Sequence, residues 1–187
     1  MTIRDAVGKD AKALAEIYGY YVNNTAVTFD YDAPTAADFE RIIAAAQEKY
    51  PFLVAEEGNR ILGYACAGLF KNKAAYARAA ETTIYLQPDA RGKGIGAQLL
   101  SALEDALRER RILNAYACIA YTEKEDHTLT NASMRFHERM GYRLCGTFRQ
   151  CGYKFGRWYD MIWMDKMLGP HEEKTAPLPA HEKTPSG

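Results

Sequence analysis

The hydrophobic positions in the first fifty residues predict a short strand followed by two helices. Residues 2–6 have the composition of a strand. Apolar side chains then recur every three or four residues, which is the period of one helix face. Thr35 and Asp38 have the spacing of a capping box, which predicts where the second helix begins. The expected buried positions are Leu14, Ile17, Tyr18, Tyr21 and Val22 in the first helix, and Phe39, Ile42, Ile43 and Ala46 in the second.

The pattern after residue 50 predicts strands that alternate with two further helices. Residues 52–57 and 61–69 are expected to be strands joined by a hairpin turn at Gly58. A strand at 82–86 precedes a helix whose apolar face consists of Ile95, Leu99, Leu100, Leu103 and Leu107. The remaining expected elements are a strand at 114–121, a helix from Asn131 to Gly141, and strands at 142–153 and 157–167. This order predicts a mixed α/β domain, without fixing the order of strands in the sheet.

Charge and hydropathy exclude several classes of partner. The chain has 24 Lys and Arg against 24 Asp and Glu, so its formal net charge is zero. We therefore expect neither a nucleic-acid surface nor an electrostatic membrane anchor. No apolar run is long enough to span a bilayer, and the first residues lack the apolar region of a signal peptide. These observations predict a cytoplasmic protein.

The cysteines and the last residues add two expectations. Cys66 and Cys118 lie within apolar runs, and no two cysteines form a Cys-x-x-Cys pair, so we expect reduced, buried thiols. No histidine has ligand spacing with a cysteine, which argues against a metal site. From Gly169 the composition becomes polar and rich in proline. This change predicts one domain over residues 1–168 and a disordered tail over residues 169–187.

A glycine-rich turn between the strand at 82–86 and the following helix is the clearest candidate for chemistry. It reads Arg-Gly-Lys-Gly-Ile-Gly over residues 91–96. The first amides of a helix have no internal partner, so such a turn favours an anion. The spacing is not that of a P-loop, and the third, distant glycine of a dinucleotide-binding turn is absent. An ordinary glycine turn before a helix remains the alternative at this point.

The same turn resembles the Arg/Gln-x-x-Gly-x-Gly/Ala signature of the GNAT acetyltransferases. Further similarity, from about residue 2 to residue 166, is to the branch that acetylates phosphinothricin, methionine sulfoximine and methionine sulfone. The matching stretches include residues 50–56, 63–65, 137–138 and 152–158. The resemblance implies a GNAT fold, a mixed central sheet of about seven strands with four helices that splays between strands 4 and 5. It also implies a bulge in the fourth strand and, as is common in this branch, a homodimer.

The resemblance implies acetyl-CoA as co-substrate and no metal. The pantetheine would pair with the backbone of Ile84, Tyr85 and Leu86, as an added strand would. Asn131 and Ser133 would contact the far side of CoA, although plain helix capping is the alternative for Asn131. The pyrophosphate would be held by Arg91, Gly92, Lys93, Gly94, Ile95 and Gly96.

Acetylation of an amine needs a base for the ammonium and an acid for the departing thiolate. Glu81, at the beginning of the strand at 82–86, is the expected base by the same resemblance. His137 occupies the position where many GNAT enzymes have a tyrosine, and an imidazole could serve as either acid or base. For Glu81 the alternative is an exposed glutamate, and for His137 it is a buried histidine that orients the substrate.

The acceptor is expected to be a small amino-acid-like amine with an oxygen-rich end. By resemblance, Lys71 and Lys73 would meet that end, and Phe29, Tyr76, Thr83 and Tyr85 would line the pocket. The acidic loop at residues 122–130, which contains Glu123, Glu125 and Asp126, instead favours a polyamine. A peptide N-acetyltransferase and a noncatalytic acyl-CoA-binding module are the other readings.

Overall fold

A computed structural model describes residues 1–172, and in this part of the chain seven strands form one sheet accompanied by four α-helices. The predicted order of elements is confirmed. Residues 173–187, most of the predicted tail, lie outside the described part. The strands are β1 (Thr2–Asp5), β2 (Phe52–Glu57), β3 (Arg60–Leu69), β4 (Ala79–Leu86), β5 (Asn114–Tyr121), β6 (Arg143–Lys154) and β7 (Arg157–Met167). The helices are α1 (Ala11–Asn24), α2 (Ala36–Gln47), α3 (Ile95–Glu109) and α4 (Ala132–Arg139).

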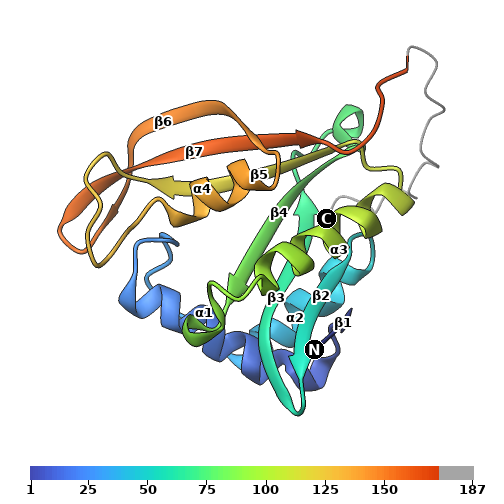
Figure 1. Cartoon of the computed structure of the whole chain (residues 1–187), viewed down its shortest axis with the longest axis horizontal. Helices are drawn as coiled ribbons and strands as arrows, with labels where there is room; N and C mark the ends of the chain where they lie inside the picture. The colour runs from blue at the N-terminus through green and yellow to red at the C-terminus, as the bar shows by residue number, and fades with distance from the viewer. Residues whose placement is uncertain (173–187) are drawn as a thin grey trace, which may run out of the picture.

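The sheet divides between β4 and β5. The strand order is β1-β2-β3-β4-β5-β7-β6, and β4–β5 is its parallel pair. Those two strands pair only where Ala79–Glu81 lies beside Asn114–Tyr116, and beyond this point they diverge (Figure 1). We call the gap beyond Glu81 the split. Its presence confirms the predicted splay between the fourth and fifth strands.

The split arises because each of the two strands follows its antiparallel neighbour. β4 pairs with β3 in one unbroken register from Leu86 to Ala80, while β5 pairs with β7 along its whole length. The expectation of a bulge in the fourth strand is therefore wrong where that strand pairs with β3, because no bulge occurs there. Two continuous antiparallel ladders leave β4 and β5 joined only at one end, which opens the sheet without any irregularity in β4.

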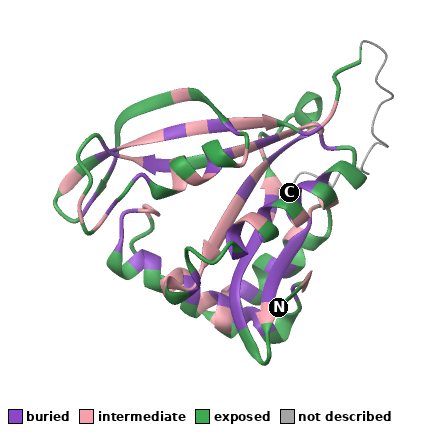
Figure 2. Ribbon diagram, in the orientation of Figure 1, coloured by how far each residue is buried: buried purple, intermediate pink, exposed green. Residues whose placement is uncertain are grey.

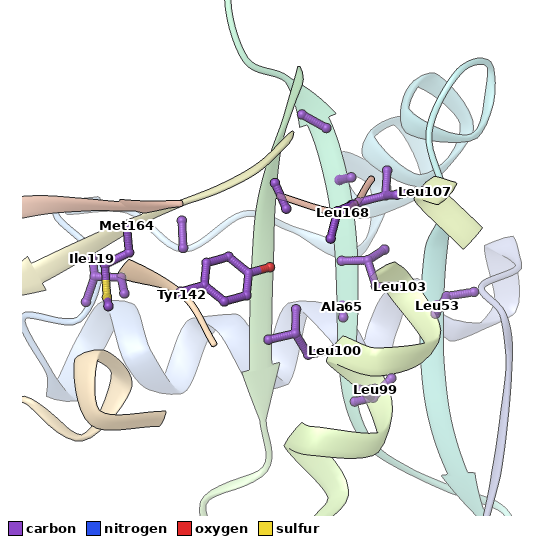
Figure 3. Packing of buried hydrophobic residues seen from close by; sticks show 14 of the residues in the cluster. Leu53, Ala65, Leu99, Leu100, Leu103, Leu107, Ile119, Tyr142, Met164 and Leu168 are labelled. Atoms are coloured by element: carbon purple, nitrogen blue, oxygen red, sulfur yellow. The ribbon is translucent and has the colours of Figure 1, made fainter. Parts of the chain in front are cut away.

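The two faces of the sheet carry separate hydrophobic clusters. Leu99, Leu100, Leu103 and Leu107 of α3 are fully buried on one face, as their spacing predicts (Figures 2 and 3). Helices α1 and α2 cover the other face. Because side chains alternate along β4, Ile84 and Leu86 face α3 and α4, whereas Tyr85 packs among the tyrosines of α1. We call the face of the sheet that Ile84 and Leu86 share the α3/α4 face, and the face that Tyr85 shares the α1/α2 face.

Two burial expectations are wrong. Ile42 is 43% exposed, because successive residues of a helix point about 100° apart and Phe39 and Ile43 already face the sheet. Cys118 is exposed because the cluster that α1 and α2 form with the sheet includes no residue of β5. Cys66 is only partly buried, and all four cysteines are free thiols.

The predicted turn glycines and the capping box at the beginning of α2 are confirmed. Gly58 and Gly141 have φ angles of 61° and 87°, the left-handed region that glycine adopts without strain. Gly58 closes the β2–β3 hairpin, and Gly141 ends α4. Thr35 and Asp38 form the reciprocal hydrogen bonds of a capping box at the beginning of α2.

Candidate active site

A cavity of about 620 Å³ occupies the split on its α3/α4 side. Three segments build it: the end of β4, the glycine turn before α3, and the beginning of α4. Of the predicted cofactor residues, those that line it are Ile84, Tyr85, Leu86, Arg91, Gly92, Gly94, Gly96 and Ser133. Sequence reasoning missed Tyr21 and Val27, which reach the cavity from α1 and the loop after it, and Phe136, Arg139 and Met140 of α4.

The glycine turn has the geometry of an anion site. Gly92 and Gly94 have φ angles of 74° and 77°, and a Cβ at either would meet nothing within 4 Å. Gly94 is the N-cap of α3 and offers no side chain to the helix's first amides. Those amides and the positive end of the helix dipole therefore remain available to a phosphate.

Two residues of the turn can contribute only through their backbone to this cavity. The Lys93 side chain lies in a separate polar groove with Arg60 and Gln98. Ile95 is buried against the core and also borders that groove. Lys93 and Ile95 are thus in the turn, as expected, but neither side chain lines the cavity.

The backbone of β4 offers hydrogen-bonding groups to the split at alternate residues. The Gln87 N–H donates to the Leu62 carbonyl at 2.8 Å, which makes these two a hydrogen-bonded pair. Such pairs alternate along an antiparallel ladder, so Tyr85 bonds to β3, whereas Ile84 and Leu86 point into the split. The expected backbone role therefore fits Ile84 and Leu86 and does not fit Tyr85.

Glu81 lies where the pairing of β4 with β5 ends, with its side chain on the α1/α2 face. It shares this face with Thr83 and Tyr85, because the three residues alternate along β4. The side chain is half-buried. Burial raises the pKa of Glu81, and the nearby Lys71 ammonium partly opposes that shift. A carboxylate with a raised pKa is a stronger proton acceptor than an exposed glutamate.

The Lys71 ammonium lies near Glu81 and next to two aromatic rings. Its Nζ is 5.2 Å from the centre of the Phe70 ring and 5.6 Å from that of Trp163. Phe70 stacks on Tyr116 with 4.1 Å between ring centres, and Tyr116 is the residue paired with Glu81. This corner combines a cation, a carboxylate and apolar walls.

The other expected acceptor residues are distributed more widely. Tyr76 contacts the Phe70 ring edge-on at 5.8 Å between centres, and Lys73 is exposed on the same loop. Phe29 lies on the far side of the split, against Tyr159 and directly over Gly152, where a Cβ would come within 2.3 Å of its ring. The structure brings Lys71 and Thr83 to Glu81 but leaves Lys73 at the periphery.

His137 is buried on α4, with only 3% of its surface exposed. Its Nδ1 is 2.9 Å from the Ser133 carbonyl, which can only accept, so we assign the proton to Nδ1 and leave Nε2 bare. Burial lowers the pKa of His137, although the Ser133 bond opposes the shift. The neutral ring packs edge-on against Phe136 and Tyr142. His137 itself does not line the cavity.

Comparison with known proteins assigns the family. The model for the acetyltransferase (GNAT) domain matches residues 3–163. Phosphinothricin N-acetyltransferase of Streptomyces coelicolor is 37% identical over 170 residues, which is 89% of this chain and 95% of the relative. The chain belongs to the GNAT acetyltransferase family. The resemblance seen in the sequence is thus confirmed.

A second relative and a solved structure agree. L-methionine sulfoximine/L-methionine sulfone acetyltransferase of Salmonella typhimurium is 34% identical, over 91% of this chain and 96% of the relative. The crystal structure of a GNAT phosphinothricin acetyltransferase from Sinorhizobium meliloti, in complex with acetyl-CoA, superposes with a TM-score of 0.84. It is 34% identical and covers 95% of this chain and 92% of that one. The enzyme class is therefore N-acetyltransferase.

Acetyl-CoA, the co-substrate in GNAT acetyltransferases, fits the observed cavity. The open glycine turn and the uncapped amides of α3 suit its pyrophosphate. The backbone of Ile84 and the N–H of Leu86, which point into the split, suit the amides of its pantetheine arm. Among the described residues, no three His, Cys, Asp or Glu side chains are grouped to hold a metal ion. None of the helices in residues 1–172 is long and apolar enough to cross a membrane.

Asn131 does something other than either expected role. Its side chain exchanges two hydrogen bonds with the backbone of Thr122, at 2.8 and 3.2 Å, and it is 7% exposed. It makes no capping bond to α4 and does not line the cavity. Asn131 therefore occupies the N-cap position of α4, as expected, but its side chain fixes the loop between β5 and α4 instead of capping the helix.

The loop at residues 122–130 offers less unpaired negative charge to a ligand than its sequence implies. Glu125 accepts two hydrogen bonds from the Arg135 guanidinium, and Asp126 is paired with Arg157. Hydrogen bonds from Thr128 and Leu129, together with the Arg157 charge, hold the pKa of Asp126 well below its usual range. Two of the three carboxylates are thus already engaged within the protein.

Proposed function

We propose that this enzyme transfers the acetyl group of acetyl-CoA to the α-amine of a small amino-acid-like acceptor. The observation that carries the proposal is that the two faces of the split differ in chemistry. The α3/α4 side presents an anion site and free strand backbone, which suit the donor. The α1/α2 side presents Glu81 beside Lys71, which suit an amine with an anionic group.

Glu81 is the proposed base. An ammonium has no lone pair, so the acceptor must lose a proton before it attacks the thioester carbon. Glu81 is half-buried at the closed end of the split, on the acceptor side, and its pKa is raised. It would accept the proton directly or through one water, and the oriented pair of substrates would supply much of the remaining rate enhancement.

His137 lies on the opposite face from Glu81, where it would act on the donor side. With its proton on Nδ1, the bare Nε2 accepts a hydrogen bond and cannot donate one unless the ring is charged. Because burial disfavours that charge, we propose that neutral His137 orients groups through Nε2. Proton return to the CoA thiolate is then left to water or to the nitrogen of the tetrahedral intermediate, which becomes cationic when the neutral amine attacks.

The proposed acceptor is of the phosphinothricin, methionine sulfoximine or methionine sulfone type. Lys71 offers an ammonium to a carboxylate or to an oxygen-rich end, and Phe70, Tyr116 and Trp163 offer apolar walls to a short carbon chain. The relatives are named for these compounds. The ion pairs of Glu125 and Asp126 weaken the case for a polyamine.

The experiment that tests the acceptor compares kcat/KM for methionine sulfone, phosphinothricin and spermidine. The parent and the Lys71→Ala/Lys73→Ala variant are measured with each. We expect the sulfone or phosphinothricin to be the best substrate of the parent, and the double variant to lose about tenfold on it. A preference for spermidine, or full activity of the variant on the sulfone, would overturn this acceptor assignment.

We also propose a homodimer formed through the β6–β7 hairpin. β6 is an outer edge of the sheet, and nine of its twelve residues are exposed. Phe148 and Trp158 are 53% and 58% exposed, with Leu144 and Tyr153 nearby on the hairpin. A long edge strand with exposed apolar side chains calls for a covering partner, and a second copy is the simplest one. The four free thiols support the proposed cytoplasmic location.

A further inference from the structure

Tyr21 is the residue of α1 that lines the cavity proposed for the acetyl donor. It lies near the end of α1, lines the cavity and is only 6% exposed. Its hydroxyl donates to the Leu86 carbonyl at 2.7 Å and accepts from Arg91 Nε at 3.2 Å. One hydroxyl therefore connects α1, the end of β4 and the first residue of the glycine turn.

The contact with Arg91 involves the ring as well as the hydroxyl. The Arg91 guanidinium carbon lies 5.0 Å from the centre of the Tyr21 ring, within the range of a cation–π interaction. Arg91 is exposed, and a free arginine of this kind samples many rotamers. Tyr21 is itself held by edge-on contacts with Tyr85 and Tyr20. A fixed tyrosine thus holds a side chain that would otherwise be mobile.

The bond to Leu86 has a second effect on the same cavity. The Leu86 carbonyl is one of the β4 groups that point into the split, and Tyr21 already occupies it. The carbonyl of Ile84 remains as the acceptor for an incoming amide. Burial raises the pKa of Tyr21, so its hydroxyl stays protonated and can donate to Leu86 at neutral pH.

We propose that Tyr21 is a positioning residue that pre-orients Arg91 for the pyrophosphate of the acetyl donor. This inference rests on the proposed use of acetyl-CoA. Binding costs less when a charged side chain is already held in its bound orientation. Tyr21 would therefore contribute to donor affinity without touching the acetyl group or the acceptor amine.

Two donors distinguish this role from a merely structural one. Acetyl-CoA carries the pyrophosphate, whereas S-acetylpantetheine has the same thioester and arm but no phosphate. Tyr21→Phe keeps the ring and removes both hydrogen bonds. We expect it to raise KM for acetyl-CoA about tenfold, to leave KM for the acceptor within about twofold, and to leave kcat/KM for S-acetylpantetheine within about twofold.

The matched control is Tyr20→Phe. Tyr20 precedes Tyr21, and its ring is 6.0 Å from the Arg91 guanidinium carbon, but within residues 1–172 its hydroxyl makes no hydrogen bond. Tyr20→Phe makes the same chemical change, and KM for acetyl-CoA should stay within about twofold of the parent value. A tenfold rise in this variant too would show that the effect is not specific to Tyr21.

A double-mutant cycle with Arg91→Ala completes the test. If Tyr21 acts through Arg91, the double variant should bind acetyl-CoA within about twofold of Arg91→Ala alone. Additive losses, an unchanged KM in Tyr21→Phe, or an equal loss with S-acetylpantetheine would overturn the proposal. Absence of acetyl-CoA binding by the parent protein would instead overturn the proposed function, so the two failures are distinguishable.

Discussion

At the scale of single residues, Glu81 is the group whose surroundings best suit proton transfer. Because burial raises its pKa, the carboxylate form that accepts a proton predominates only above an unusually high pH for a glutamate. As the pH decreases, kcat/KM should therefore begin to fall at a pH above the range in which an ordinary glutamate titrates. Glu81→Gln should lower kcat about 10²-fold and remove this limb, which initial rates across pH would reveal. Near-parental turnover in the glutamine variant would exclude Glu81 as the base.

Lys71 provides a signed test of the same assignment. Its ammonium lowers the pKa of Glu81, so Lys71→Met should move the acid limb of the profile to higher pH. Lys12→Met, an exposed lysine at the beginning of α1, is the matched control and should leave the limb in place. If the limb moves to lower pH, or is unchanged with Lys71→Met, the limb does not report Glu81.

The roles of the two ring nitrogens of His137 can be tested separately. The amide of His137→Asn can replace the Nδ1 bond to the Ser133 carbonyl but not the bare Nε2, whereas His137→Gln places an amide near Nε2. We expect Gln to retain more activity than Asn, measured as kcat at saturating donor and acceptor. The reverse order would show that the contact with Ser133, rather than Nε2, is what the reaction requires.

The individual contacts of the site mark the limit of sequence reasoning. The bond from Arg91 to Tyr21 joins residues 70 positions apart, and no local pattern encodes such a pair. Tyr21 was predicted to be buried, and it is, but its hydroxyl distinguishes it from the other core positions only once Leu86 and Arg91 are in place. Asn131 was misread for the same reason, because its partner Thr122 belongs to the preceding loop.

At the scale of elements, the glycine turn before α3 carries a prediction for donor binding. Gly94→Val would place a branched side chain in the open space beside the first amides of α3, where we expect the pyrophosphate. It should weaken acetyl-CoA binding at least tenfold in calorimetric titration, because the phosphate and the side chain compete for the same space.

A control must separate this block from backbone strain. Gly58→Val has a similar positive φ and equally open surroundings, but it lies in the β2–β3 turn, away from the cavity. The left-handed backbone should cost each variant about 1–2 kcal/mol of stability, since an L-residue is strained there. Only Gly94→Val should lose affinity. Equal affinities in the two folded variants would remove the turn from the donor site.

The elements were more predictable than their arrangement. Helix α3 follows from its own spacing, because each apolar residue on one face is three or four positions from the next. The position of the split does not follow from spacing. It depends on β4 keeping its ladder with β3 while β5 keeps its ladder with β7, and the last residue of β5, Tyr121, pairs with Asp160, 39 positions further along the chain. Family resemblance supplied what periodicity could not.

At the scale of the whole molecule, the β6–β7 hairpin carries the prediction of assembly. Replacing Trp158 with Glu should convert the proposed dimer to a monomer in sedimentation velocity, because a charge would be buried without a partner. Ile42→Glu, which changes a 43% exposed apolar residue of α2, is the control and should leave the association unchanged. A parent protein that sediments as a monomer at micromolar concentration contradicts the proposal outright.

The composition of the last residues gives a further prediction for the intact chain. Residues 173–187 include three prolines and have no apolar periodicity. We therefore expect that their removal leaves the contacts of the hydrophobic core intact. The deletion should leave both the melting temperature and kcat essentially at parental values in thermal unfolding and rate measurements. A clear fall in either would show that this segment contributes to the domain.

The central claim is that one split in the sheet holds an acetyl donor on one face and a small amino-acid-like amine on the other. The most direct measurement is to mix the enzyme with acetyl-CoA and L-methionine sulfone and to quantify free CoA and acetylated product together by mass spectrometry. We predict one N-acetyl product for each CoA released, with turnover suppressed in Glu81→Gln. Binding of acetyl-CoA without an acetylated product from the sulfone, phosphinothricin or any other small amine would contradict the account.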